Sequence, residues 1–475
     1  MTVLSNRHPG LDPGSTLSSK RQFWKKRWIP AFAGMTMAFA SPVCAQTIAI
    51  TGGTVALGDG SQPIRGGTVV IRDGRIVAAG SMQTKLPAGT EVIDATGKWV
   101  TPGIVAGFSR LGLAEVDLTA SAEDGGGRDD TSGAADDTTS NGPFNAAIDV
   151  VPAINPLDTT IAVNRADGVT RALVAPGSGK NIFAGQGAVI DTAAHMDSIT
   201  AARKFQFVEL GETGATAAGG SRASAFVLFR NALREAAELK GFARPIAVRR
   251  QRSEDVLLTR FDAAALVPVL QGRQYLFVHV ERARDILNVL GLAQEFPGLK
   301  LVLVGASEGW TVADRIVTAG VPVIASPVND LPASFEQIAA TQSNVGRMRS
   351  AGVKVSIGMI DDNDTRNLFK ERQYAGNLVG LLKIPGAAGV SWGEALAMIT
   401  SGPAEAIGMG GELGSLAPGR RADVVIWSGD PLEGTSAAEA VFIDGVRQPL
   451  ETHQTRLLHR YRYLNRRDLP EAYRH

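Results

Sequence analysis

Two hydrophobic periods alternate through the middle of this 475-residue chain. Short apolar runs, which indicate buried strands, are followed by segments with the 3.6-residue period of amphipathic helices, such as 282–296 and 310–320. The strand-like runs are TRALVAP (170–176), YLFVHV (275–280), KLVLVGA (300–306), PVIASP (322–327) and VKVSIGMI (353–360). Continued over roughly 300 residues, this rhythm predicts a parallel sheet, and its length fits a (β/α)8 barrel.

Both flanks of this region read as short strands joined by tight turns. Asp73-Gly74 lies between two apolar runs in 66–80, and Asp444-Gly445 follows a strand predicted over 439–443, with another over 422–427. Such dipeptides are typical of two-residue hairpin turns. We therefore predict an α/β fold in which a small β-sandwich, built from 46–100 and 406–450, accompanies a TIM-like barrel over 101–405.

The charge balance bears on possible partners. Residues 1–45 hold six Lys/Arg and one acid, which leaves 42 of the 48 basic and 46 of the 47 acidic side chains for the rest. A nucleic-acid-binding surface needs an excess of basic groups, so we expect no nucleic-acid partner. With 44% hydrophobic residues, the chain can bury a large core.

The first 45 residues have the layout of an export signal. A basic stretch, KRQFWKKR (20–27), precedes a weakly apolar one (29–40), and Val43 and Ala45 occupy the small-residue cleavage positions. This predicts a periplasmic protein that begins at Gln46; a misassigned start codon is the alternative. Cys44 is the only cysteine, so the mature chain would contain no disulfide. No other run reaches the ~18 apolar residues of a membrane span, so we expect no membrane anchor.

Two further segments have a biased composition. The stretch 120–142 is acidic and rich in Gly, Ser and Thr, and it follows the first predicted barrel strand. It is interpreted as a mobile cover over the barrel mouth or as a plain solvated loop. The tail 451–475 contains three histidines and several arginines, for which a surface tail is favoured over an anion-binding segment.

Several stretches together resemble the amidohydrolase superfamily, in the branch of imidazolonepropionase-like and dipeptidase-like enzymes. They are 92–113, 168–187, the strand around His279, 413–433 and 440–449. The resemblance extends from Thr47 to about Gln448. It implies a metal-bearing barrel beside a small β-sandwich. It also implies hydrolysis of carbon–nitrogen bonds other than ordinary peptide bonds, in substrates such as dipeptides or cyclic amides.

The resemblance also implies metal ligands at the ends of the barrel strands: a His-x-His pair, a lysine or acid, two further histidines and an aspartate. In chain order these positions fall on Phe108, Arg110, Phe207, His279, Gly305 and Asp361. Glu209 and Glu212 lie near the third position as substitutes. Phenylalanine has no donor atom and arginine has no lone pair to give. Since catalytic zinc usually takes three protein ligands, we expect at most one weakly bound divalent metal such as zinc, and no binuclear centre.

Four residues are the candidates for the site. His279 and Asp361 are predicted as catalytic residues and metal ligands, and Arg110 and Glu308 as substrate-binding residues. A guanidinium binds a carboxylate through two hydrogen bonds, which suits Arg110 to an anionic substrate. The structural alternatives are a hydrogen-bonded His279 in the barrel mouth, Asp361 as a helix N-cap, and an ion pair between Arg110 and Glu115.

Covalent catalysis has no candidate nucleophile, because the sequence has no GxSxG motif before a helix and no cysteine after export. The first hypothesis is therefore an amidohydrolase-type hydrolase of small molecules. The alternatives are a metal-less pseudo-enzyme that binds a small molecule in the periplasm, and a non-catalytic partner of an active paralogue. The chain is also a candidate to form a homo-oligomer.

Overall fold

The computed structural model describes residues 47–81, 86, 88–113, 142–240, 257–360 and 366–462. The elements below belong to one unit, Ala45–His475. Several predictions from the sequence lie outside the described residues: the export signal, the roles of Asp361 and Glu115, the acidic stretch 120–142 apart from Gly142, and residues 463–475 of the tail.

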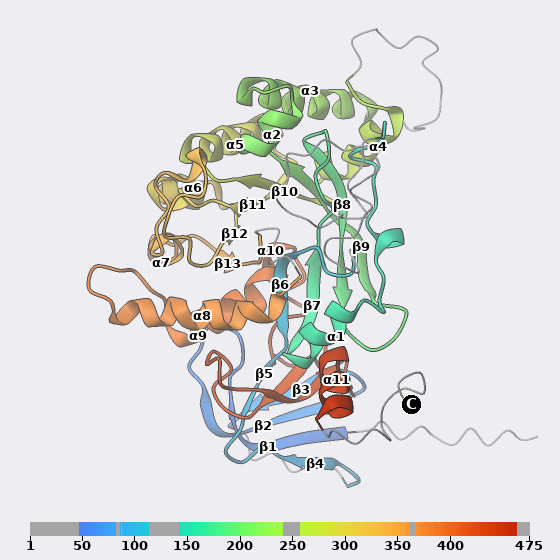
Figure 1. Cartoon of the computed structure of the whole chain (residues 1–475), viewed down its shortest axis with the longest axis vertical. Helices are drawn as coiled ribbons and strands as arrows, with labels where there is room; N and C mark the ends of the chain where they lie inside the picture. Colours follow the sequence, from blue (N-terminus) through green and yellow to red (C-terminus); the bar gives the residue numbers. More distant parts are fainter. Residues whose placement is uncertain are drawn as a thin grey trace, which may run out of the picture. The chain divides into compact units, whose positions relative to one another are not determined.

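The strands from the two ends of the chain form one sheet. They are β1 (Thr47–Val55), β2 (Ile64–Arg72), β3 (Arg75–Gly80), β4 (Glu91–Asp94), β5 (Trp99–Pro102), β14 (Val424–Trp427), β15 (Ala438–Ile443) and β16 (Val446–Arg447). Their order is β16-β15-β14-β5-β1-β2-β3, and β4 pairs with β1. Figure 1 labels β1 to β5 of this sheet. β14 pairs antiparallel with β5, which joins the two ends. The sheet that accompanies the barrel is thus built from both ends of the chain, and one path of pairing connects all its strands except β4, which branches from β1.

Both predicted hairpins are present. Asp73 and Gly74 have φ angles of 52° and 72° between β2 and β3, and Asp444 and Gly445 have 50° and 75° between β15 and β16. Two successive positive φ angles are the signature of the type I′ turn, whose twist matches that of antiparallel strands.

Eight strands make up the barrel sheet. In spatial and chain order they are β6 (Ile104–Ser109), β7 (Val169–Val174), β8 (Phe183–Asp191), β9 (Ile199–Glu209), β10 (Tyr275–Val280), β11 (Lys300–Gly305), β12 (Val323–Ala325) and β13 (Val355–Ile357). The first and last strands lie close together, as a distance between them shows. A Cβ atom on Gly107 of β6 would lie 2.9 Å from the carbonyl oxygen of Ile357 in β13. The sheet is therefore nearly closed, and the TIM-like α/β fold is confirmed.

One strand departs from a plain (β/α)8 barrel. β8 runs antiparallel to both of its neighbours, β7 and β9. No helix lies between these three strands, and parallel strands would need a long crossover connection. Gly187 allows the close packing here, because a Cβ atom at this position would lie 2.1 Å from the ring of Phe205.

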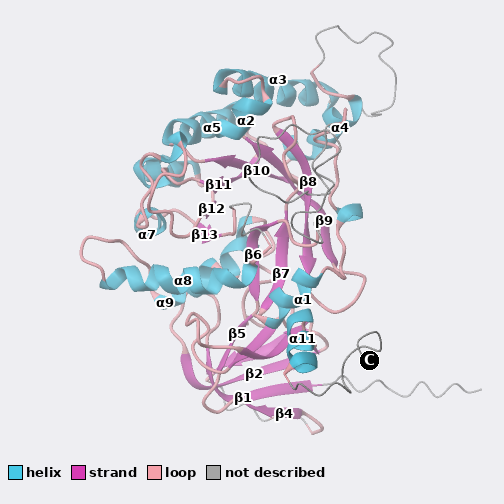
Figure 2. Cartoon of the chain, in the orientation of Figure 1, coloured by secondary structure: helices cyan, strands magenta, loops and turns pink. Residues whose placement is uncertain are grey.

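Helices surround the barrel sheet (Figure 2). They are α1 (Thr159–Ala166), α2 (Gly211–Ala217), α3 (Arg222–Lys240), α4 (Arg260–Leu270), α5 (Ala283–Glu295), α6 (Ala313–Ala319), α7 (Asn344–Ser350), α8 (Glu371–Gly380), α9 (Trp392–Met398), α10 (Ser401–Ala406) and α11 (His453–Tyr461). Within the described ranges, no helix has the length and apolar character needed to cross a bilayer.

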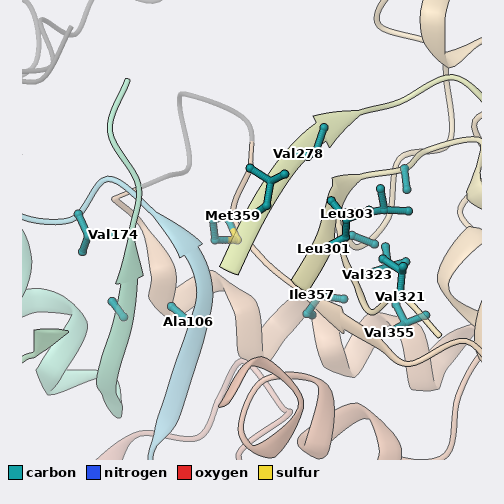
Figure 3. Close-up of a cluster of buried hydrophobic side chains, with 14 of the residues drawn as sticks. Ala106, Val174, Val278, Leu301, Leu303, Val321, Val323, Val355, Ile357 and Met359 are labelled. Atoms are coloured by element: carbon teal, nitrogen blue, oxygen red, sulfur yellow. The ribbon is translucent and has the colours of Figure 1, made fainter. Parts of the chain in front are cut away.

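Alternation along the strands separates two apolar cores. Val278 of β10 and Leu303 of β11 belong to the outer core beneath the helices (Figure 3), which also contains Ile286 and Val289 of α5. Side chains of the opposite parity fill the barrel interior: Phe205, Phe207, Phe277, Val302 and Val304, together with Phe108. Because adjacent side chains point to opposite faces, the residues that continue the inner series are those that reach the barrel mouth.

A buried ion pair joins the barrel to the sheet of the chain ends. The Arg171 side chain of β7 is fully buried, and its Nε and Nη2 atoms lie 2.8 and 3.0 Å from the two carboxylate oxygens of Asp423. Nη2 also lies 2.9 Å from Asp444, and Nη1 donates to Thr200 at 2.7 Å. Burial opposes the charged form, but the two carboxylates outweigh it and raise the pKa of Arg171.

Candidate functional site

His279 lies at the carboxyl end of β10, in the inner series of side chains that includes Phe277. In the register of the sheet it is opposite Glu209 at the end of β9 and Val304 of β11. Its side chain is 20% exposed, whereas that of Glu209 is 7% exposed. The carboxyl ends of barrel strands carry the active sites of TIM-barrel enzymes, and His279 lies at such an end. Its catalytic role stays a prediction.

Each ring nitrogen of His279 contacts a carboxylate. Nδ1 lies 2.6 Å from Oε1 of Glu209, and Nε2 lies 3.0 Å from Oε1 of Glu281. Oε2 of Glu281 accepts a hydrogen bond from the backbone N–H of Ser307 at 2.7 Å. Burial opposes a charged imidazole, but Glu209 and then Glu281 outweigh it and raise the pKa of His279 well above its ordinary value. Burial also acts on Glu281, yet its bond to His279 lowers the pKa of that carboxyl.

A second polar cluster adjoins this one. Glu336 accepts hydrogen bonds from the backbone N–H of Glu212 at 2.8 Å and from Nη2 of Arg222 at 3.1 Å. Arg222 also lies 3.3 Å from a carboxylate oxygen of Glu212 and 3.3 Å from one of Asp285. Burial raises the pKa of Glu336, and Arg222 partly offsets this. Glu336 and Arg222 were not predicted from the sequence, because neither follows a predicted strand or belongs to a motif.

Of the two predicted substrate-binding residues, Glu308 has both carboxylate oxygens engaged. They accept hydrogen bonds from the backbone N–H groups of Ala283 at 2.9 Å and Ala339 at 3.0 Å. These bonds tie the segment after β10 to the segment after β12, which is a structural role. Arg110 follows β6 and is half-buried. Substrate binding by either residue stays a prediction.

The donor set tests whether the described residues fit a metal centre. At two of the implied ligand positions, the rings of Phe108 and Phe207 pack edge to face with centroids 5.2 Å apart, and each side chain is 1% exposed. At a third, a Cβ atom on Gly305 would lie 2.3 Å from Oε1 of Glu281. Among the residues that the structure describes, no group of three His, Cys, Asp or Glu side chains is placed to hold a metal ion. These residues do not fit a binuclear metal centre.

Two cavities lined by described residues lie at opposite ends of the barrel sheet. Around the carboxyl ends of β12 and β13 the described residues enclose about 110 Å³, lined in part by Ser326, Asn329 and Tyr374. A cavity of about 670 Å³ lies near the amino ends of β10, β11 and β13, where it is lined by Tyr275 and Lys300 among others. Its size suits a ligand pocket, but the catalytic residues of TIM barrels lie at the other end.

Comparison with known proteins gives consistent matches. Residues 300–451 match the family model of the amidohydrolase family. The amidohydrolase tasK of Hapsidospora irregularis is 27% identical over 405 residues, which cover 77% of this chain and 38% of that protein. A 5-methylthioadenosine/S-adenosylhomocysteine deaminase of Teredinibacter turnerae is 33% identical over 112 residues, or 23% of this chain and 24% of that protein. The chain thus spans well under half the length of either relative.

A solved structure supports the fold over nearly its whole length. The crystal structure of an amidohydrolase from Thermotoga maritima MSB8 superposes with a TM-score of 0.71 and 24% identity, and the match covers 84% of this chain and 99% of that one. Sequence and fold agree with the resemblance found in the motifs, and together they support the amidohydrolase superfamily for this chain.

Proposed function

We propose that this chain hydrolyses carbon–nitrogen bonds of small molecules, with dipeptides and cyclic amides as the first substrates to test. The observation that carries the proposal is the position of His279 at the carboxyl end of β10, hydrogen-bonded to Glu209, in a chain similar to the amidohydrolase superfamily. The catalytic geometry of such barrels is built from side chains at these strand ends.

The reaction needs two proton transfers. Water adds to the carbonyl carbon and gives a proton to a base, and the leaving nitrogen takes up a proton as the carbon–nitrogen bond breaks. In the proposal His279 protonates the leaving nitrogen from Nε2, which exchanges its hydrogen bond to Glu281 for one to that nitrogen, while Nδ1 stays bonded to Glu209. Asp361 is proposed as the base, and Arg110 as the group that binds an anionic substrate. No step is assigned to a metal ion, because the described residues do not fit a binuclear centre.

The test is turnover by the mature chain, residues 46–475, with dipeptides and cyclic amides. His279→Ala is expected to lower kcat/KM by about 100-fold or more, the usual contribution of a general acid. His195→Ala is the control, because the His195 side chain is 51% exposed and carries no proposed role. Unchanged turnover in His279→Ala would show that the site is misassigned.

A second function is favoured by the apolar contact between Phe108 and Phe207. This contact fills space that the superfamily resemblance gives to ligands of a catalytic metal, and it suits a binding protein without hydrolytic activity. If the panel shows no turnover, calorimetric titration of the same compounds separates a binding protein from an inert one. Co-purification with a second, active amidohydrolase would instead favour a non-catalytic subunit.

A further inference from the structure

We infer that the Glu281 carboxylate fills the space that a side chain at position 305 would need. Together with Glu209 and His279 it forms a bridge that fixes the His279 ring without a metal ion. The inference concerns how the site is held together, so it stands whether or not the proposed hydrolysis occurs. The bridge consists of these three side chains. Glu209 and Glu281 are its positioning residues, since they act through His279.

The space around Gly305 leaves no room for a side chain. Gly305 ends β11 with φ of +87°, and a Cβ atom there would lie 2.3 Å from Oε1 of Glu281 and 2.9 Å from Cδ2 of His279. Real Cβ atoms do not approach a neighbour within 3.0 Å. A side chain at 305 and the bond between Glu281 and His279 therefore exclude each other. The superfamily resemblance expects a histidine at this position, and the structure places a carboxylate in its space.

The backbone that follows β11 binds the Glu281 carboxylate. Ala306 is fully buried and has φ of +53°, a left-handed conformation that L-residues adopt rarely. This turn directs the N–H of Ser307 to Oε2 of Glu281, while the N–H of Ala306 donates to the carbonyl of Val280 at 2.8 Å. The carboxylate is thus bonded on both oxygens, one to β10 and one to the end of β11.

The two ring nitrogens of His279 are both engaged by carboxylates. Glu209 holds Nδ1 and Glu281 holds Nε2, so both nitrogens already have partners. A metal ligand must offer a nitrogen lone pair, and a nitrogen that shares a proton with a carboxylate has none to offer. A metal ion would have to break one of these bonds. On the inner side the Phe108–Phe207 contact offers no donor to complete its coordination.

Glycine variants of the mature chain test the steric step through thermal melting. Gly305→Ala is expected to lower Tm by several degrees more than Gly320→Ala. Gly320 is the matched control, since it has φ of +66° and nothing within 4 Å of its Cβ position. Adding Glu281→Ala to Gly305→Ala is expected to cost less than Glu281→Ala costs alone, because the clash has been removed. Equal shifts for the two glycine variants, or strictly additive shifts in the double variant, would overturn the inference.

The metal content of the wild-type chain is an independent measurement, which remains possible if Gly305→Ala does not fold. After incubation with Zn²⁺ and dialysis, the wild-type chain is expected to retain far less than one zinc per chain by mass spectrometry of the metal. Chelator treatment is expected to leave its Tm unchanged. Glu281→Gln is expected to lower Tm more than Glu439→Gln, whose side chain is 41% exposed. Stoichiometric zinc that His279→Ala abolishes would refute the bridge, and would do so without any activity assay.

Discussion

Replacing Arg171 by methionine should destabilise the protein by about 3–5 kcal/mol, the usual cost of removing one partner of a buried ion pair. The fully buried guanidinium makes two hydrogen bonds to Asp423 and an ion pair with Asp444. Asp423 is itself only 5% exposed. Methionine fills a similar volume but leaves the Asp423 carboxylate with a hydrogen bond from the N–H of Asp444 and without its cation. Against a typical total of about 5–15 kcal/mol, this loss is large.

Equilibrium unfolding of residues 46–475 in urea measures the effect, with tryptophan fluorescence as the signal, since Trp427 is buried in β14, the strand that follows Asp423. Arg421→Met is the matched control: its side chain is 31% exposed and binds the same Asp444 at 2.9 Å, so it should cost less than about 1 kcal/mol. Replacing both Arg171 and Asp423 by apolar residues should recover part of the loss. A change below about 1 kcal/mol for Arg171→Met would refute the reasoning.

Burial and strand pairing lead to three more predictions. Glu371 is fully buried, neither of its carboxylate oxygens has a hydrogen-bond partner among the described residues, and burial raises its pKa well above 4.5. The contribution of Glu371 to stability should therefore be greatest below pH 4.5 and fall as the pH rises through its folded-state pKa, by at most about 1.4 kcal/mol per pH unit. Glu371→Gln should remove this contribution from a urea-unfolding pH series, and a series unchanged by the substitution would contradict the prediction. Phe207→Ala should cost about 3–5 kcal/mol in the same assay, because the ring is 1% exposed in the barrel core, and a loss below about 1 kcal/mol would show that this core is loosely packed. Truncation after residue 421 removes β14 to β16 and should abolish cooperative unfolding, and a shortened chain that melts sharply would disprove it.

The elements found correctly from the sequence are those with a local signal. Apolar runs located β7, β10, β11, β12 and β13, and two Asp-Gly pairs located the hairpins. The helix expected after β7 is absent, because β8 follows it directly. β8 was missed because it is antiparallel and no helix accompanies it, so the rhythm that indicates a barrel passes over it.

The site was predictable where the chemistry follows a strand. His279 was placed at the mouth because it ends an apolar run, and the tripeptide HVE contained a second signal. Residues 279 and 281 are two apart, so alternation puts them on one side of the strand. Glu336 could not be found this way, because its contact with Arg222 joins segments 114 residues apart without a periodic pattern. The role of Asp361 stays a prediction.

The pairing of β14 with β5 has a consequence for how the protein is made. Trp99 lies opposite Trp427 in that ladder, so the central contact of the first sheet joins residues from opposite ends of the chain. While the ribosome is still adding the barrel, strands β1 to β5 have an open edge where β14 will later pair. Contacts of such long sequence separation form late and slowly. We therefore expect the nascent chain to depend on a chaperone, or on rapid burial of that edge, until its last fifty or so residues emerge.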